Sequence, residues 1–547
     1  VELIYSSNRD LDFLPHGVDK GTAAAFIADK LGYDKDHVIV SGNSGNDIAL
    51  FQQGFLGVIV ANSHDDLKRI KDEPRVYLTE SPIADGVMEG IEYWTAQKDI
   101  SSSNDRKTDR SKGNTQGLDP GNKNPEISSA ANGKSEEDIF MEGYRRSIDL
   151  LHECATTHGF LASPTVKDNY RRIWGRDSCI IGLASLMTGE HELIECLKRS
   201  LETLAAHQGP HGEIPSNVDV ETKRVSYGGT AGRVDANLWF IIACAEYYKK
   251  TDDKDFINSM LKPIEKVRFL LGAWEFNARG LLYVPPTGDW ADEYVHSGYV
   301  LYDQLLYYMA QRAIAHLHDK WHGSGDHGLQ ANRSRLRHLI RANYWFSAAG
   351  DENEDDIYHE HLYCKGRKAA QKHKGPHWMS FFSPLGYGYR FDTLANALVS
   401  LFGISDEDQN KAVDDYIQEN LIPEEIMLLP AFHPVITPQD QDWPELQMTF
   451  SHSFKNAPYE FHNGGLWCLV TGFYAMSLAR RNMKDRAERY LYDMHRANQM
   501  EVDGKPWRFA EYLHGKKIIP EGTLRMGWNA AVTIMTHHYL EGQELFE

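Results

Sequence analysis

Two stretches of the sequence decide the expected fold: EYLHGKKIIPEGTLRMGWNAAVTIMTH at 511–537 and PPTGDWADEYVHSGYVLYDQLLYYMA at 285–310. In each, carboxylates stand in a turn rich in glycine and aromatic residues, directly before a long apolar helical segment. We therefore expect acidic groups from both turns to meet at the mouth of a helical bundle, with Asp289, Asp292 and Glu511 as candidates. Glycoside hydrolysis needs such a pair, because one carboxylic acid protonates the leaving oxygen while a second carboxylate activates water or attacks the anomeric carbon.

The composition limits the classes of partner and compartment. The 547 residues carry a net charge of −20 with a pI of about 5.7, which argues against nucleic acid and anionic membranes and favours a small neutral ligand. The six cysteines form neither a CxxC pair nor a cluster at metal-ligand spacing, so we expect reduced thiols, a cytosolic protein and no metal site. The sequence has no run of eighteen apolar residues, so we expect no membrane span. It leaves open whether the protein forms a homo-oligomer.

Residues 1–98 alternate between strand-like and helix-like segments, which predicts part of an α/β domain with a parallel sheet. The expected strands are VELIY at 1–5, VIVSG at 38–42, GVIVAN at 57–62 and VYLT at 76–79, and the expected helices span 20–32, 46–53 and 64–71. Residues 99–137 are rich in Ser, Asn, Gly, Lys and Asp and nearly lack apolar side chains, which predicts a disordered linker.

From residue 138 to residue 547 the apolar period becomes helical, as with Leu193, Leu197, Leu201 and Leu204. About a dozen such segments predict a large all-α domain, a closed ring of six helical hairpins or (α/α)6 toroid, with its active centre in the loops at one end. The segments lie near 138–158, 178–187, 190–206, 234–250, 254–273, 300–317, 329–345, 392–402, 406–419, 465–481, 485–499 and 527–541.

Six loops between these segments share Asp, Glu, Arg, His, Trp, Tyr and Gly. They are NYRRIWGRDS at 169–178, GGTAGRVDANLWF at 228–240, PPTGDWADEY at 285–294, GYGYRFD at 386–392, YEFHNGGLW at 459–467 and PWRFAEYLHG at 506–515. Arg–Asp pairs suit bidentate contacts with sugar hydroxyls, and Trp174, Trp290 and Trp467 offer faces on which sugar rings stack. The repetition of this composition predicts a sugar-binding pocket.

The motifs IYSSNRDLDFLPHGVDKGTAA, VIVSGNSGND and GVIVAN within residues 1–98 resemble the C-terminal part of the sucrose-phosphatase-like branch of the haloacid dehalogenase superfamily. The resemblance implies that Lys20 steadies a phosphoryl group and that Asp47 matches one of two Mg²⁺ ligands. The other ligand position holds Asn43, which removes a negative charge from a hard-cation site. The family's nucleophile strand would precede Val1, so we expect a structural remnant without phosphatase activity, and Mg²⁺ only in a complete phosphatase domain.

A second resemblance covers about residues 140–545. The motifs DWADEYVHSGYVLYDQLLYYMAQRA, SPLGYGYRFDTLANALVSLFGISDEDQ, YEFHNGGLWCLVTGFYAM and FAEYLHGKKIIPEGTLRMGWNAAVTI are similar, in order, to those of the alkaline/neutral invertases of glycoside hydrolase family 100. That family is an (α/α)6 barrel that hydrolyses sucrose without a cofactor, and the resemblance places its acid at Asp292 and its base at Glu511, with Asp289 as the competing acid. It also assigns sugar binding to Arg176, Asp177, Arg233, Asp235, His462 and Asn463.

Departures from that family leave the substrate open. GRDSCIIG at 175–182 and ADEYVHSG at 291–298 differ from the invertase motifs, and IWGRD resembles the amylo-1,6-glucosidase part of glycogen debranching enzymes. Sucrose is the leading substrate, an α-glucoside in an oligosaccharide or small glycoside is the rival, and a phosphatase or sugar-binding scaffold on the N-terminal segment is the third hypothesis. For the mechanism we expect Asp292, lying against Trp290, to be protonated at rest, Glu511 to be ionised, and the anomeric configuration to invert.

Overall fold

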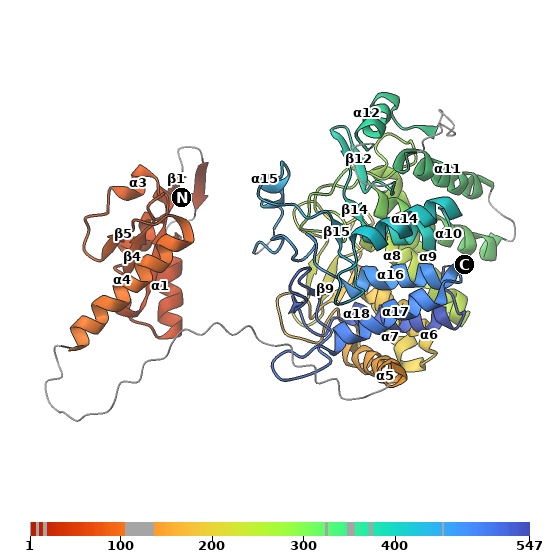
Figure 1. The fold of residues 1–547 in the computed structure, drawn as a ribbon, viewed down its shortest axis with the longest axis horizontal. Coiled ribbons are helices and arrows are strands. Elements are labelled where there is room, and N and C mark those ends of the chain that lie inside the picture. The colour runs from red at the N-terminus through yellow and green to blue at the C-terminus, as the bar shows by residue number, and fades with distance from the viewer. Residues whose placement is uncertain are drawn as a thin grey trace. The chain divides into compact units, whose positions relative to one another are not determined.

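The computed structural model describes residues 2–6, 10–14, 19–103, 136–322, 327–346, 356–370, 376–450 and 453–546. The chain divides into two compact units, residues 1–128 and 129–547, coloured red to orange and yellow to blue in Figure 1. Most of the expected linker, and with it the disorder predicted there, lies outside the described residues. Its two ends are helical: α4 (Ile83–Ser103) continues past residue 99, and α5 (Glu136–Cys154) begins before residue 138.

The first unit contains the parallel sheet predicted from the strand–helix alternation. Strand β4 (Leu56–Ile59) lies between β3 (Ile39–Gly42) and β5 (Val76–Leu78), with Ile39 opposite Leu56 and Gly57 opposite Val76. All four residues of β4 are buried, as a central strand requires. Its helices besides α4 are α1 (Lys20–Leu31), α2 (Ile48–Gln52) and α3 (Asp65–Lys68), with single turns η1 (Lys35–His37) and η2 (Gly45–Asp47).

The sequence-based placement of VELIY in this parallel sheet is wrong. Strand β1 (Glu2–Ser6) pairs antiparallel with β2 (Asp10–Leu14), a strand that we did not expect, and the two form a sheet of their own. Residues 7–9 alone separate the strands, which is enough for a hairpin turn and far too few for the crossover that parallel neighbours need.

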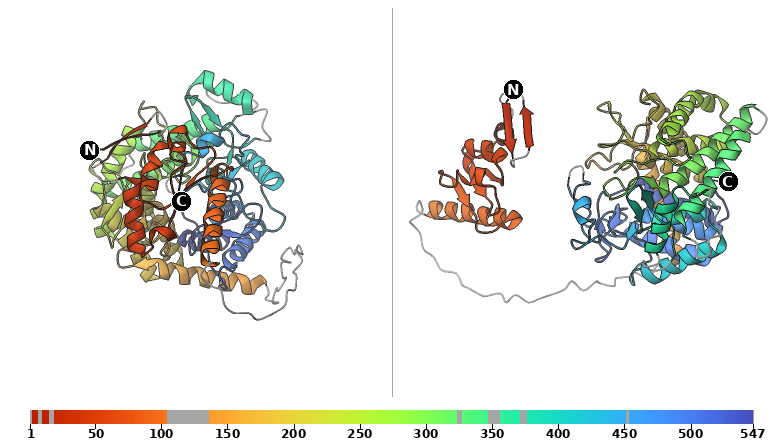
Figure 2. Two further views of the ribbon diagram at one scale, coloured as in Figure 1. Left: turned by 90° about the vertical axis from the view of Figure 1, so that its left-hand side faces the viewer. Right: turned by 90° about the horizontal axis from the view of Figure 1, so that it is seen from above.

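The second unit is the closed ring of helical hairpins that the 3.6-residue period predicted. Each inner helix contacts the next, and the last contacts the first, so the ring closes. The inner helices are α6 (Gly175–Thr188), α8 (Asp235–Thr251), α10 (Leu301–His322), α13 (Thr393–Leu401), α16 (Cys468–Arg480) and α18 (Gly527–Leu540). The outer helices are α5, α7 (His191–Ala206), α9 (Lys254–Trp274), α11 (His327–Tyr344), α14 (Glu407–Asn420) and α17 (Lys484–Gln499). Figure 2 shows these helices gathered into one body.

Burial separates the two rings. Nearly every residue of α6, α8, α16 and α18 is buried, because inner helices touch neighbours on all sides. Outer helices bury one stripe, such as Leu193, Leu197, Leu201 and Leu204 of α7. Two described helices, α12 (Glu360–Ala370) and α15 (Trp443–Leu446), fall outside the expected dozen.

Short antiparallel strands hold the loops in front of the inner helices, and their length of two or three residues hid them from periodicity. Strands β8, β9 and β10 form one sheet, β11, β12 and β13 another, and β6–β7, β14–β15 and β16–β17 are pairs. They are β6 (Ala155–Thr156), β7 (Gly159–Phe160), β8 (Ile173–Trp174), β9 (Asn217–Asp219), β10 (Arg224–Ser226), β11 (Tyr299–Val300), β12 (Phe381–Ser383), β13 (Gly386–Gly388), β14 (Phe391–Asp392), β15 (Phe432–His433), β16 (Tyr512–Leu513) and β17 (Pro520–Glu521).

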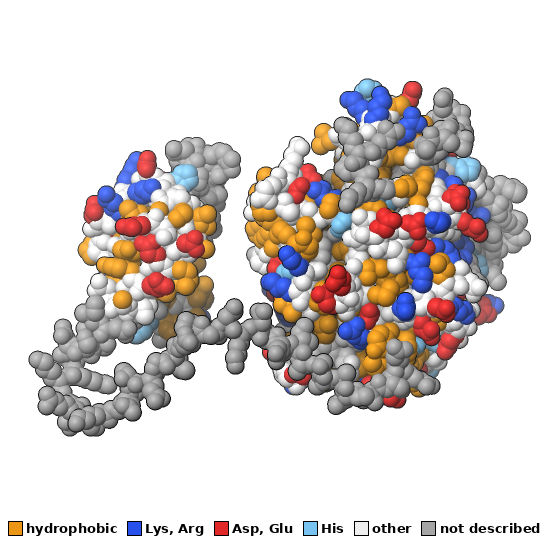
Figure 3. All heavy atoms as spheres, in the orientation of Figure 1, with side chains coloured by type: hydrophobic (Ala, Val, Ile, Leu, Met, Phe, Trp, Pro, Cys, Tyr) orange, Lys and Arg blue, Asp and Glu red, His pale blue; other side chains and the backbone are white. Residues whose placement is uncertain are grey.

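The surface carries charges of both signs. On the face of the second unit in Figure 3, Lys and Arg side chains are interspersed with Asp and Glu. Among the helices that the structure describes, none combines the length and the hydropathy needed to cross a bilayer.

Two imidazoles in contact make the stability of the ring depend on pH. The Nε2 atoms of His495 on α17 and His537 on α18 lie 2.9 Å apart, and His495 is fully buried. Burial, and next the neighbouring His538, lower the pKa of His537 to about 4, and burial, and next His537, lower the pKa of His495 well below its ordinary value. The unfolded chain therefore binds protons that the folded chain does not between pH 6.5 and 4, and stability falls as the pH falls through that window.

We expect His537→Gln to flatten this pH dependence, because it removes one of the two titrating rings. A shift of the size seen at His537 is worth about 3 kcal/mol between pH 6.5 and 4. Urea unfolding at pH 7 and pH 4.5 measures the slope, with His361→Gln at an exposed position as the control. Equal slopes in the His537 variant and the control would contradict the explanation.

Candidate active site

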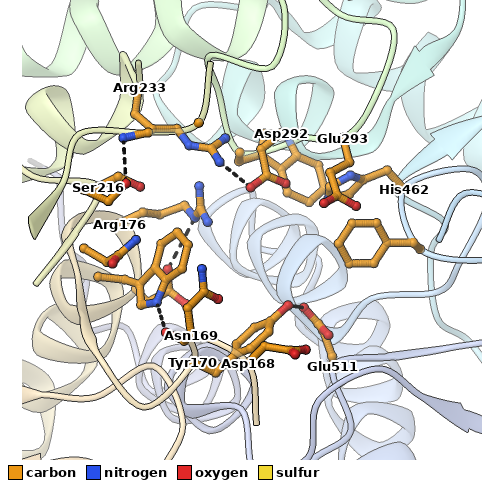
Figure 4. Close-up of a pocket in the computed structure, with 18 of the residues that line it drawn as sticks. Asp168, Asn169, Tyr170, Arg176, Ser216, Arg233, Asp292, Glu293, His462 and Glu511 are labelled. Carbon is orange, nitrogen blue, oxygen red and sulfur yellow. Dashed lines mark hydrogen bonds and ion pairs between the residues drawn. The ribbon is translucent and has the colours of Figure 1, made fainter. Parts of the chain in front are cut away.

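A cavity of about 330 Å³ lies among the loops at the N-terminal ends of inner helices. Both opening stretches of the sequence reach it, through Glu511 and through Asp292. Figure 4 shows these two carboxylates projecting into it from different sides. Five of the six loops singled out from the sequence contribute lining residues, whereas the loop at 386–392 does not; its Asp392 is fully buried and caps α13.

Asp292, in the loop before α10, forms an ion pair with Nη2 of Arg233. The guanidinium is held in place because its Nη1 also donates to the carbonyl oxygens of Thr287 at 3.0 Å and Asp289 at 2.6 Å. Burial alone would raise the pKa of Asp292, but the charge of Arg233, together with that of Arg176, outweighs burial and leaves that pKa below its ordinary value.

Glu511 lies at the start of the β16–β17 hairpin and is held by two donors. Its Oε1 accepts a hydrogen bond from the Tyr170 hydroxyl at 2.6 Å, and its Oε2 accepts one from the Thr523 amide at 2.9 Å. A Cβ on Gly522 would come within 2.5 Å of Oε2, so this glycine, at φ +80°, makes room for the carboxylate. Burial raises the pKa of Glu511 above its ordinary value, although both hydrogen bonds oppose the rise.

The direction of the pKa shift at Asp292 is opposite to the one that we expected. From the sequence, Asp292 was to be the carboxyl with the raised pKa because of its apolar neighbour Trp290. The structure instead gives it a guanidinium partner, and the raised pKa belongs to Glu511. Arg233 is brought in from the start of α8, which the local sequence around Asp292 does not reveal.

The competing acid, Asp289, lies outside the lining of the cavity. It is fully buried, and its Oδ2 lies 2.7 Å from Nδ1 of His296 while its Oδ1 accepts from the Ala291 amide at 3.0 Å. Burial would lower the pKa of His296, but Asp289 raises it above the ordinary value. The geometry therefore favours Asp292 as the carboxyl that contacts a ligand. The contacts of Asp289 stabilise the loop before α10.

We expect Asp289→Asn to cost stability and to spare activity. The change weakens a buried ion pair, which is worth roughly 1–3 kcal/mol in the free energy of unfolding. The contact with Arg233 uses the backbone carbonyl of residue 289 and survives. Urea unfolding and turnover per folded molecule measure the two effects separately, and a thousandfold loss of turnover at unchanged stability would instead make Asp289 the acid.

Most of the sugar-binding residues proposed from the sequence line the cavity. They are Trp174, Arg176, Asp177, Arg233, Trp290, His462 and Trp467. Asp235 and Asn463 lie behind the lining. Asp235 accepts from Nη1 of Arg176 at 2.9 Å, and Asn463 accepts from the Ile436 amide at 2.6 Å, so both position the loops that the ligand would touch.

Aromatic side chains line part of the cavity, and burial shifts the pKa values of two of its ionisable groups. His462 stacks on Trp467 with ring centres 5.4 Å apart, and Trp290 meets Trp467 edge to face at 5.9 Å. Burial lowers the pKa of His462 to about 3, so this ring is neutral at physiological pH. Burial raises the pKa of Asp177 to about 6, against the opposing charge of Arg176.

Several lining residues were not singled out from the sequence: Asp168, Asn169, Tyr170, Ser216, Asn217, Ser226, Gly228, Gly229, Glu293, Ser453, Lys455, Phe461 and Trp528. Tyr170, Glu293 and Phe461 stood in loops already recognised by composition, and Trp528 stood in the first stretch quoted. The serines and Lys455 are ordinary surface types, and no local pattern marked them.

The residues of the first unit that matched a phosphatase form an intramolecular network. Lys20 Nζ lies 2.5 Å from Asp47 Oδ1, and Asp47 Oδ2 accepts from the amides of Asn43 at 2.9 Å and Ser44 at 3.2 Å. The Asp47 carboxylate is thus already neutralised by a lysine, the other ligand position of the resemblance holds the neutral Asn43, and the nearby Asp66 carboxylate accepts from the Gly45 amide at 3.0 Å. This donor set does not fit a divalent cation, and we derive no reaction step through it.

Comparison with known proteins gives one match for each unit. Residues 150–541 match the family model described as alkaline and neutral invertase, and residues 1–95 match that of sucrose-6F-phosphate phosphohydrolase. Alkaline/neutral invertase E, chloroplastic, of Arabidopsis thaliana is 25% identical over 392 residues, 61% of this chain and 61% of that protein. Mannosylfructose-phosphate phosphatase of Agrobacterium fabrum is 40% identical over 96 residues, 17% of this chain and 39% of that protein. The chain thus spans about two fifths of that phosphatase.

Solved structures confirm the (α/α)6 fold. The mannosylglycerate hydrolase from Thermus thermophilus in complex with Tris superposes with a TM-score of 0.52 at 14% identity, covering 72% of this chain and 99% of that one. A bacterial glucoamylase complexed with acarbose superposes with a TM-score of 0.50 at 14% identity, covering 74% and 56% of the two chains.

Proposed function

The chain belongs to the alkaline and neutral invertase family of glycoside hydrolases, and we propose that it hydrolyses sucrose with Asp292 and Glu511 as its acid and base. The observation that carries the proposal is that both carboxylates, from loops far apart in sequence, line one cavity with an aromatic floor. The compartment that we propose is the cytosol, in keeping with six free cysteines.

Unpaired polar atoms support a ligand rich in hydroxyl groups. Buried atoms of four lining residues have no hydrogen-bond partner among the described residues: Arg233 Nε, Trp290 Nε1, His462 Nδ1 and Trp528 Nε1. Arg176 Nε and Asp177 Oδ2 also make no hydrogen bond there, but they form an ion pair with each other at 3.6 Å. A buried polar group without a partner costs about 1–3 kcal/mol, so a ligand that supplies the partners gains affinity and one that lacks them is rejected.

The two carboxylates receive different roles from their surroundings. Two fixed donors hold Glu511 and favour its ionised form, the form that takes a proton from water, against the opposing effect of burial. In the free enzyme Asp292 is paired with Arg233 and cannot donate a proton. We infer that the entering sugar separates this pair and that Asp292 then takes a proton from solvent. Asp292 delivers this proton to the glycosidic oxygen as its bond to the anomeric carbon breaks, and water attacks that carbon from the opposite side with inversion while giving a proton to Glu511. The residues present suffice for these steps without a cofactor.

A second substrate is favoured by a specific observation. The first unit is 40% identical to a mannosylfructose-phosphate phosphatase, so mannosylfructose, which like sucrose joins a hexose to fructose, is the alternative glycosyl fructoside. The rival reading, an α-glucoside in an oligosaccharide, rests on the departures at 175–182 and 291–298. A phosphatase is disfavoured by the network around Lys20 and Asp47, and a sugar-binding scaffold by the two carboxylates that line the cavity.

Product release from a panel of substrates at neutral pH tests the proposal. The panel holds sucrose, mannosylfructose, isomaltose, panose and sucrose 6-phosphate, and Asp292→Asn is the control. We expect fructose from sucrose and none from the variant. Glucose from isomaltose with no turnover of sucrose would move the assignment to α-glucosides, and phosphate release would restore the phosphatase hypothesis.

A further inference from the structure

Tyr170 stands at the point where the loop before α6 meets the Glu511 hairpin. We propose that Tyr170 is a positioning residue that holds the carboxylate of Glu511 in its working orientation, an inference that rests on the base role proposed above. Its hydroxyl donates to Oε1 at 2.6 Å (Figure 4). The Thr523 amide donates to Oε2 at 2.9 Å. Each oxygen is thus tied to a different segment, so the plane of the carboxylate cannot rotate freely.

The loop that carries Tyr170 is fastened to the segment that carries Thr523. Lys167 Nζ donates to the Gly522 carbonyl at 2.8 Å, and Ser163 Oγ donates to the Leu524 carbonyl at 2.9 Å. Within the loop, the Tyr170 amide donates to the Lys167 carbonyl at 3.2 Å. These contacts tie the two donors of Glu511 together, and they explain how a residue 341 positions away in sequence can set the geometry of the base.

The electrostatics keep Tyr170 a donor. Burial, and next the charge of Glu511, raise the pKa of Tyr170 well above its ordinary value, so the hydroxyl keeps its proton at any pH at which the enzyme works. The cations facing Glu511 are Lys455, from the loop before α16, and Lys167; Asp292 and Asp177 face Tyr170 from the other walls. The hydroxyl opposes the upward pull of burial on Glu511, so its removal raises the pKa of that carboxyl further.

The test is Tyr170→Phe, which keeps the ring and removes only the hydroxyl. We expect the acidic limb of the kcat/KM profile to move up by about one pH unit, because a hydrogen bond to a charged group has about that value. The loss of kcat should accordingly be larger at pH 5 than at pH 8, with KM little changed. An equal loss of kcat at every pH, with the acidic limb of the kcat/KM profile unmoved, would mean that Tyr170 only packs against its neighbours. That result would overturn the proposal.

Tyr344→Phe is the matched control, because that buried hydroxyl donates to the Tyr299 carbonyl at 2.9 Å and lies outside the cavity lining. It should leave the limb unmoved. Infrared difference spectra of the carboxyl, assigned by their loss in Glu511→Gln, give the titration of Glu511 without any substrate. If Tyr170→Phe raises the midpoint of the Glu511 titration, the proposal for Tyr170 is upheld. An absence of turnover on every glycoside would contradict only the proposed function. An unmoved midpoint would overturn the proposal for Tyr170.

Discussion

Replacing Asp292 by Asn is expected to lower kcat on sucrose by about 10³-fold, the middle to upper range for loss of a general acid. The variant keeps a side chain of the same size next to Arg233 but has no proton to deliver to the leaving oxygen. Because the loss is confined to protonation of the leaving group, KM should change by less than about tenfold. Steady-state kinetics at neutral pH measure both quantities.

A substrate whose leaving group needs no proton provides the control. Fluoride departs unassisted, so Asp292→Asn should release fluoride from α-glucosyl fluoride within about tenfold of the wild-type rate. An equally large loss on sucrose and on the fluoride would contradict the acid role. The comparison of the two substrates therefore shows whether Asp292 acts as the acid although its pKa is lowered in the free enzyme and that of Glu511 is raised.

Replacing Glu511 by Gln is expected to lower kcat by about 10³-fold or more on both substrates, because activation of water is needed whichever group leaves. The amide has nearly the same shape and keeps one acceptor for Tyr170, while its NH2 group cannot accept the hydrogen bond from the Thr523 amide. Matched kinetics on sucrose and α-glucosyl fluoride, with circular dichroism to confirm folding, make the measurement. Fluoride release at the wild-type rate would move the role of base to another residue.

The periodicity of apolar residues in the sequence was sufficient to predict the helical ring. Apolar residues at 3.6-residue spacing located all twelve ring helices, and the polar loops before them marked the correct end of the ring for the cavity. This periodicity is a local signal, because the apolar residues of a helix show by themselves which of its faces is buried. The hairpin of β1 and β2 was missed since a strand pattern does not say which neighbour it pairs with.

The site needed contacts that sequence spacing does not contain. Asp289 and Asp292 are three residues apart in the same turn, and only the folded loop turns one towards His296 and the other towards the cavity. The partner that reverses the expected protonation of Asp292 is 59 residues away in sequence. Tyr170, in a loop recognised by composition, gained its role from a contact across the ring.

Proton NMR of sucrose during the first minutes of hydrolysis reports both the substrate and the stereochemistry, and so tests sucrose hydrolysis by Asp292 and Glu511 in a single experiment. We predict fructose together with β-glucose, with α-glucose appearing only later as the anomers equilibrate. Initial α-glucose would mean retention and would contradict direct attack by water activated at Glu511. An unchanged sucrose spectrum from folded enzyme would contradict the assignment of sucrose itself.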